Sequence, residues 1–285
     1  MNLKVRPLNI KREEEKKMLI GGREFDLKNH TYVMGILNVT PDSFSDGNKY
    51  NEKDAALKQV EKMVLEGVDI VDLGGESTRP GYTLISEEEE IGRVIPIIEA
   101  IKKEFEIPLS LDTYKSNVAK AGIDAGVDMI NDVWGLKYDD LIAEVISDSQ
   151  LPCCLMHNRK EPIYDDFLND MMADIAQTIK IAEEAGISNE KIILDPGIGF
   201  GKKYEHNLYI LKNMEALHMF GYPLLLGASR KSVIGKCLDL LVSDRVEGTL
   251  VTTVMAVMKN YGFVRVHDIK ENVRAVKMAE AIMKQ

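Results

Sequence analysis

The feature that most constrains this chain is a unit that occurs eight times between residue 33 and the last residue. Each unit is a short apolar run, a polar break and an amphipathic helical pattern; the apolar runs cover residues 33–39, 69–73, 109–112, 129–133, 152–157, 192–196, 224–228 and 264–267. Strands that alternate with helices pair in parallel and are buried on both faces. Eight such strands with right-handed crossovers can close on themselves, whereas open doubly wound sheets usually have fewer strands. We therefore predict the α/β class and a (β/α)8 TIM-type barrel.

The helical segments between the runs have recognisable boundaries. Ser86 followed by Glu89 is a capping-box pattern, which predicts a helix start. Three longer helices are expected, over residues 165–186, 207–220 and 242–261. Glycine readily adopts the left-handed conformation that closes a helix, so each should end at its neighbouring glycine: Gly186, Gly221 and Gly262.

The segment before the first unit, residues 1–32, has a different pattern. Residues 3–10 could form a strand, Gly21-Gly22 a turn and residues 23–27 a returning strand. We expect this N-terminal β-hairpin appendage to close one end of the barrel. Residues 33–285 contain no linker or shift in composition, and a barrel needs about 250 residues, so we expect them to form a single catalytic domain.

The composition narrows the class of protein. The formal net charge of −10 argues against a nucleic-acid-binding surface, although local basic sites for phosphate remain possible. The chain has no apolar stretch long enough to span a membrane and no signal peptide pattern, so we expect a cytoplasmic protein without membrane contact. Its three cysteines, Cys153, Cys154 and Cys237, are expected to be buried free thiols.

Polar side chains end every apolar run, and in a barrel the carboxyl ends of the strands build the active site. Asp112, Asn131 and Asp195 are short side chains with hydrogen-bond acceptors. Together they could bind the N–H edge of a flat heterocycle such as a 2-amino-4-oxo pteridine. Taken singly, each could equally be a helix cap or a strand-end hydrogen bond, and Asp72 could simply anchor a loop.

A second set of strand-end residues is cationic or can become so: Arg79, Lys231, Arg265 and His267. Arginine can bind a phosphate or carboxylate with two parallel hydrogen bonds. This set predicts a binding site for an anionic group of the substrate. The glycine-rich run at residues 197–202 lacks the spacing of a nucleotide phosphate loop.

Eight motifs give the chain a resemblance to a known family. They are GILNVTPDSFSDG at residues 35–47, DLGGESTRPG at 72–81, SLDT at 110–113, NDV at 131–133, MH at 156–157, DPGIGFGK at 195–202, GASRKS at 227–232 and RVHD at 265–268. In their order and spacing they resemble dihydropteroate synthase, from Met34 to the last residue. One departure is Lys160, where the commoner pattern has glycine; it leaves the local loop shape open.

The resemblance implies a folate-pathway transferase. The family joins 6-hydroxymethyl-7,8-dihydropterin diphosphate to p-aminobenzoate and releases 7,8-dihydropteroate and pyrophosphate. The pterin-binding residues that it implies are Asp112, Asn131, Asp195, Lys231, Met156 and Phe200. Asn38 would approach the diphosphate and its Mg²⁺, and the implied catalytic residues are Asn38, Arg79, Lys231, Arg265 and His267.

For p-aminobenzoate the resemblance points to the loops that follow the first two strands. The implied contacts are Pro41, Phe44, Thr78 and Ser229, with Lys231 toward the carboxylate. A dissociative displacement needs water to be excluded, and residues 40–47 and 75–81 are the expected lid. The family is commonly dimeric, so a homodimer through the later helices is expected, and sulfonamides, which mimic p-aminobenzoate, are expected to inhibit.

Two other functions would use the same pterin pocket. A methyltetrahydrofolate-binding methyltransferase domain shares the barrel but needs no diphosphate site, so Asn38, Lys231 and Arg265 argue against it. An inactive relative that only binds pterin predicts lost catalytic residues, yet every matched position is occupied.

Overall fold

The computed structural model describes residues 17–39, 49–76 and 84–284. Eight parallel strands form one sheet in the order β8-β7-β6-β5-β4-β3-β10-β9. Their bounds are β3 Tyr32–Asn38, β4 Ile70–Gly74, β5 Leu109–Asp112, β6 Met129–Asp132, β7 Cys153–Met156, β8 Ile192–Asp195, β9 Leu225–Leu226 and β10 Phe263–Val266. A parallel bridge between Leu194 and Leu224 joins the two outer strands. The predicted closed barrel is therefore confirmed. Each observed strand overlaps a predicted run and extends at most one residue beyond it.

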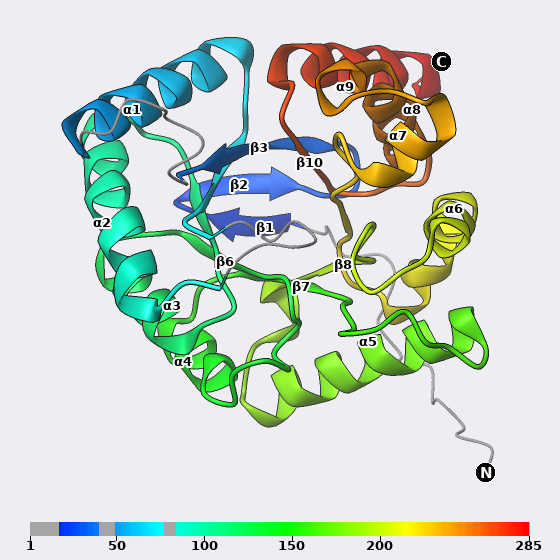
Figure 1. Cartoon of the computed structure of the whole chain (residues 1–285), viewed down its shortest axis with the longest axis horizontal. Helices are drawn as coiled ribbons and strands as arrows, with labels where there is room; N and C mark the ends of the chain where they lie inside the picture. The colour runs from blue at the N-terminus through cyan, green and yellow to red at the C-terminus, as the bar shows by residue number, and fades with distance from the viewer. Residues whose placement is uncertain (1–16, 40–48, 77–83, 285) are drawn as a thin grey trace.

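Helices form an outer ring around the strands (Figure 1). They are α1 Lys49–Glu66, α2 Glu87–Glu104, α3 Ser116–Asp124, α4 Ile142–Ser149, α5 Phe167–Glu184, α6 Tyr204–Lys212, α7 Ser232–Leu238, α8 Val246–Met258 and α9 Ile269–Met283. Ser86 caps α2 as predicted, since its side chain accepts a hydrogen bond from the Glu89 N–H at 3.2 Å. None of the helices in the described part of the chain is both long and apolar enough to cross a membrane.

Two of the predicted helices differ from the observed ones. Residues 207–220 do not form one α-helix, because α6 ends at Lys212 and a separate 3₁₀ helix covers Met214–Phe220. The helix expected over residues 242–261 is α8, which ends at Met258. Gly262 does not end it, because the left-handed residue after α8 is Asn260, at φ 55°.

A β-hairpin closes the amino end of the barrel, as predicted, but its first strand was placed wrongly. Its strands are β1 Lys17–Ile20 and β2 Arg23–Asp26, joined by Gly21 and Gly22 at φ 56° and 77°. A two-residue turn with positive φ at both positions joins strands that directly flank it, so residues 17–20, not 3–10, pair with β2. Residues 3–10 lie outside the described residues.

The hairpin packs directly against the barrel interior. Met18, Ile20 and Phe25 form one buried cluster with Met34 and Phe263 from the strands. The hairpin therefore seals the end of the barrel opposite the carboxyl ends of the strands. The division into an appendage, residues 1–32, and a catalytic domain, residues 33–285, stays a prediction.

The strand register brings polar residues to one level at the open end. Asn38 pairs with Gly74, Gly74 with Asp112, and Asp112 with Asn131. Below this level the barrel interior is filled by apolar side chains, among them the free thiol of Cys154, whereas the free thiol of Cys153 is buried between the strands and the helices. The third cysteine, Cys237, is exposed, so the expectation that it is buried was wrong.

Candidate active site

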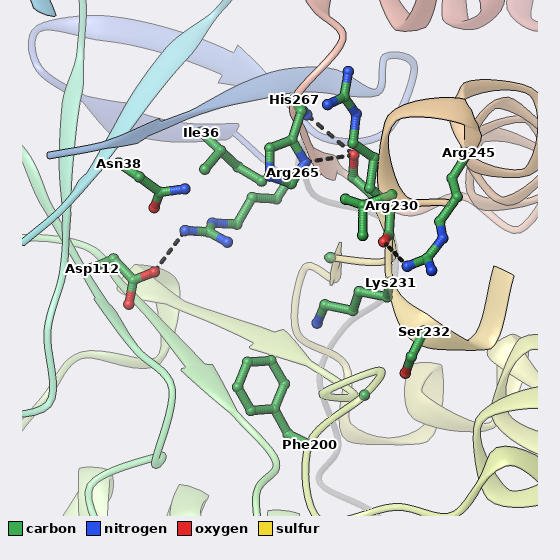
Figure 2. Close-up of a pocket in the computed structure, with 14 residues that line it drawn as sticks. Ile36, Asn38, Asp112, Phe200, Arg230, Lys231, Ser232, Arg245, Arg265 and His267 are labelled. Carbon is green, nitrogen blue, oxygen red and sulfur yellow. Dashed lines mark hydrogen bonds and ion pairs between the residues drawn. The ribbon is translucent and has the colours of Figure 1, made fainter. Parts of the chain in front are cut away.

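A cavity of about 260 Å³ opens at the carboxyl end of the barrel (Figure 2). Its lining includes Asp112 from the acceptor set and Lys231, Arg265 and His267 from the cationic set, together with Asn38, Phe200 and Ser229, which the family resemblance implied. Because these residues end or follow five different apolar runs of the sequence, closure of the barrel is what places them around one space.

Arg265 lies at the centre of a buried ion network. Its Nε lies 2.5 Å from Asp72 Oδ2, and its Nη2 lies 2.6 Å from Asp112 Oδ2. Asn131 Nδ2 donates to Asp72 Oδ2 at 3.1 Å. Arg265, predicted as a free ligand for an anion, therefore already binds two carboxylates. Asp72, which the sequence left as a possible loop anchor, is part of this network.

The carboxylates keep acceptor capacity for a ligand. Within the described part of the chain, Asp72 Oδ1, Asp112 Oδ1 and Ser110 Oγ are buried without a hydrogen-bond partner. Burial raises the pKa of Asp112 to about 7, and the Arg265 guanidinium partly offsets this rise. Burial would lower the pKa of Arg265, but Asp72 and Asp112 raise it above its ordinary value. The guanidinium thus stays charged beside acceptors that lack donors.

Lys231 and Phe200 face each other on the next part of the wall (Figure 2). Lys231 Nζ lies 4.3 Å from the centre of the Phe200 ring and donates a hydrogen bond to the Ile198 carbonyl. Burial lowers the pKa of Lys231 to about 8, against the opposing effect of Asp195. Burial likewise raises the pKa of Asp195, whose Oδ1 accepts the Gly197 N–H at 2.7 Å.

Met156 lies where the sequence placed it. It forms a small buried cluster with Tyr114 and Val133, and Phe200 and Trp134 pack against that cluster. Trp134 is therefore a packing residue at the edge of the mouth. A flat ring that entered beside Asp112 and Asn131 would meet an apolar surface here.

His267 and Ser229 form the remaining polar wall. Ser229 Oγ lies 3.0 Å from His267 Nδ1 and accepts the His267 N–H at 3.1 Å. Next to them, the Arg230 guanidinium forms an ion pair with Asp268. Arg230, Ser232, Val242 and Arg245 line the cavity beyond Lys231 but were not predicted to do so. Ser232 could have been found, because it directly follows the GASRK run.

Asn38 ends β3 and reaches the same space. A Cβ atom on Gly74 would lie 3.7 Å from Asn38 Oδ1 and 3.8 Å from Asp112 Oδ2, so both oxygens flank one point of the rim. No group of three or more His, Cys, Asp or Glu side chains among the described residues could hold a metal ion. Mg²⁺ needs no such cage where a substrate phosphate and one or two protein oxygens bind it. This donor set fits that mode.

Pro41, Phe44, Thr78 and Arg79 lie outside the described residues, as does most of the predicted lid. Of the acceptor set, Asp112 lines the cavity, while Asn131 lies in β6 and Asp195 ends β8 without lining it. Three of the four predicted cationic residues, Lys231, Arg265 and His267, line the cavity.

Comparison with known proteins identifies the family. The family described as "Pterin binding enzyme" matches residues 34–267. The dihydropteroate synthase of Clostridium beijerinckii is 55% identical over 269 residues, which cover 94% of this chain and 100% of that protein. The enzyme of Bacillus subtilis is 50% identical and covers 90% of each chain.

Solved structures agree. A dihydropteroate synthase from Clostridium difficile, crystallised in the presence of pteroic acid, is 48% identical with a TM-score of 0.89, over 92% of this chain and 100% of that one. The Xanthomonas albilineans enzyme with 4-aminobenzoic acid is 38% identical with a TM-score of 0.91, over 95% and 100%. The chain belongs to the dihydropteroate synthase family.

Proposed function

We propose that the mouth of this barrel condenses 6-hydroxymethyl-7,8-dihydropterin diphosphate with p-aminobenzoate, giving 7,8-dihydropteroate and pyrophosphate. The observation that carries the proposal is the pairing of buried, unpartnered carboxylate oxygens with cations around one cavity. Two relatives were crystallised with pteroic acid and with 4-aminobenzoic acid, which supports the same pair of ligands here. The chain is thus a transferase of folate synthesis.

The pterin ring fits the acceptor side of the mouth. Its N–H edge would donate to Asp112, Asn131 and Asp195, and Asp112 Oδ1 is buried and has no other donor. Met156 and Phe200 would contact its faces, with Lys231 beside the ring. The Asp72–Arg265 pair supports this role by fixing Asp112 from the opposite side.

The diphosphate fits the cationic side. His267 and the charged Arg265 would bind its oxygens, together with Arg79. Two nitrogens of Arg265, Nε and Nη2, already bind carboxylates. Arg265 would therefore attract the diphosphate through its positive charge and not through two parallel hydrogen bonds. We propose Asn38 and the diphosphate oxygens as ligands of one Mg²⁺, which would add positive charge beside the leaving group.

The aminobenzoate fits between Lys231 and the rim. Ser229 and Lys231 would bind its carboxylate, with Ser232 next to them, while Pro41, Phe44 and Thr78 would contact its ring. The lone pair of its amine forms the new C–N bond at the pterin methylene carbon as the C–O bond to the diphosphate breaks. The C–O electron pair leaves with pyrophosphate, and the amine loses one proton. No protein nucleophile takes part.

We also propose a cytoplasmic homodimer. Three free cysteines suit a reducing compartment. Val251 and Met258 on α8 and Met278 and Ile282 on α9 are apolar side chains that are each about 60% exposed, which supports a partner surface on these helices. Sedimentation equilibrium should show a dimer, and a monomer at micromolar concentration would contradict this part.

The function is tested by turnover. The protein is incubated with the pterin diphosphate, p-aminobenzoate and Mg²⁺, and dihydropteroate is measured by chromatography. We expect product, and inhibition by a sulfonamide that is competitive with p-aminobenzoate. Pteroic acid binding without product would favour the inactive pterin-binding relative instead.

A further inference from the structure

A side-chain network outside the cavity links two of its loops. It consists of Lys202, His157, Asp174 and Arg159, and none of these four has a role in the proposed reaction. His157 and Lys202 lie in two of the motifs, at the ends of β7 and of the 195–202 segment. His157 is 1% exposed, so it cannot contact a substrate in the mouth.

The hydrogen bonds of His157 fix which nitrogen carries its proton. Nε2 lies 3.0 Å from Asp174 Oδ2, and a carboxylate can only accept, so Nε2 donates. Nδ1 is then an acceptor, and Lys202 Nζ lies 2.7 Å from it. Burial and the Lys202 charge lower the pKa of His157 to about 4, which keeps the imidazole neutral. Arg159 Nε binds the same Asp174 oxygen at 2.6 Å, completing a chain of alternating donors and acceptors.

Lys202 has two further acceptors, and both are backbone carbonyls. Its Nζ donates to the Phe200 carbonyl at 2.9 Å and to the His157 carbonyl at 3.3 Å. The Nζ group therefore joins residue 157 to the 197–202 segment through three contacts. Burial lowers the pKa of Lys202, and the Asp195 and Asp174 carboxylates oppose that shift. We call this arrangement the Lys202 strap.

The two loops that the strap joins are in close backbone contact. A Cβ atom on Gly201 would lie 2.5 Å from the Arg159 carbonyl oxygen, and one on Gly197 would overlap the His157 carbonyl. Both glycines also have positive φ, at 53° and 70°. Because these positions admit no side chain, the segment has little freedom beside residues 157–159, and the strap fixes it there.

The strapped segment builds one wall of the mouth. Its Ile198 carbonyl accepts the Lys231 ammonium, and its Phe200 ring lies under the same ammonium (Figure 2). Phe200 also packs against the cluster of Met156 and Val133. A shift of the segment would therefore move Phe200 and the partner of Lys231 together.

We propose that Lys202 is a positioning residue, which acts through the 197–202 segment to hold Phe200 and Lys231 where the pterin ring binds. This inference rests on the proposed function for the identity of the ligand. It assigns Lys202 no contact with substrate.

The test compares the parent with Lys202→Met, which keeps the length of the side chain but removes its hydrogen-bond donors. Two quantities are measured: the Kd for pteroic acid, by calorimetry, and the wavelength of maximum fluorescence emission of Trp134, the only tryptophan in the chain. Because Trp134 packs against the same cluster as Phe200, its emission reports on this wall without any ligand. We expect the Kd to rise at least about tenfold and the emission to shift.

Two further variants separate the effect of losing a positive charge from the effect of losing the hydrogen bonds of Lys202. Lys203→Met removes a neighbouring, exposed positive charge and should leave both readouts unchanged. His157→Leu removes the ring acceptor without removing a cation but leaves both carbonyl acceptors of Lys202, so it should raise the Kd in the same direction and by no more than Lys202→Met. Because the two side chains share one contact, the double variant should be no more than about twofold weaker than Lys202→Met alone.

Three results would overturn the proposal: a Kd for Lys202→Met within about twofold of the parent, an unchanged Kd in His157→Leu, or effects that multiply in the double variant. Thermal melts confirm folding. If an apolar variant does not fold, His157→Gln retains one donor for Asp174 and one acceptor for Lys202. Its Kd should stay within about threefold of the parent, and a larger loss would also count against the strap.

The outcome for the strap is distinct from that for the proposed function. Failure of the parent to bind pteroic acid or to form dihydropteroate would refute the function alone. The emission of Trp134 in ligand-free Lys202→Met would still decide whether the strap sets this wall.

Discussion

Replacement of Arg265 by methionine should destabilise the barrel, and more so at alkaline pH. The guanidinium binds Asp72 and Asp112, whose side chains are 0% and 8% exposed. Its removal leaves two carboxylates close together in a buried site, and loss of one partner of a buried ion pair costs about 3–5 kcal/mol. In a chain of this size we expect a fall in Tm of about 10 °C.

The pH dependence follows from the pKa of Asp112, which burial raises to about 7 even with Arg265 present. A carboxyl group whose pKa is raised on folding binds its proton more tightly in the folded state. Stability therefore falls as the pH rises from about 4, the unfolded value, to the folded-state pKa. In the parent this fall is complete near the folded-state pKa of about 7. Without Arg265 the pKa is higher still, so the fall should continue above that value.

Urea unfolding of parent and variant at about pH 6 and about pH 8.5 measures both effects. Arg274→Met, a change at an exposed arginine of α9, is the matched control and should leave stability unchanged. Adding Asp112→Asn to Arg265→Met should remove most of the extra loss at the higher pH. A free energy of unfolding equal to that of the parent, or a deficit that is the same at both pH values, would refute the reasoning.

Three further predictions concern the mouth of the barrel. Asp195→Ala should lower kcat/KM about a hundredfold while the protein stays folded, because a buried pterin donor would lose its acceptor; near-parental turnover would remove Asp195 from the site. The turnover rate should fall as the pH rises through about 8, the pKa at which Lys231 loses its proton. Lys231→Arg should shift this alkaline fall in rate to higher pH, and a fall at the same pH in the variant would mean that another group causes it. Chelation of divalent cations should abolish turnover and added Mg²⁺ should restore it, whereas full turnover in the chelator would exclude Asn38 as a metal-binding residue.

The sequence was sufficient to predict the strands because each apolar run ends in polar residues at the mouth. It placed Asn38, Asp112 and Arg265 at strand ends, and the structure brings them around one cavity. The first strand of the hairpin was missed because residues 17–20 are few and begin with a lysine. The break after α6 was missed because apolar spacing continues through the following 3₁₀ helix.

Contacts across the barrel could not be predicted from one sequence. Asp72 and Arg265 are 193 residues apart, and only the closure of the sheet brings them within 2.5 Å. The Lys202 strap was missed for a similar reason, because its three acceptors come from two loops whose approach depends on positive-φ glycines. Local patterns thus placed residues at the mouth but did not reveal which of them bind one another.

A crystal structure of this chain with pteroic acid tests the proposed site most directly. We predict the ring edge at Asp112, Asn131 and Asp195, the ring against Phe200, and the carboxylate toward Lys231 and Ser229. A pteroic acid molecule bound at the mouth with its ring away from these three acceptors, or bound elsewhere on the barrel, would contradict the account.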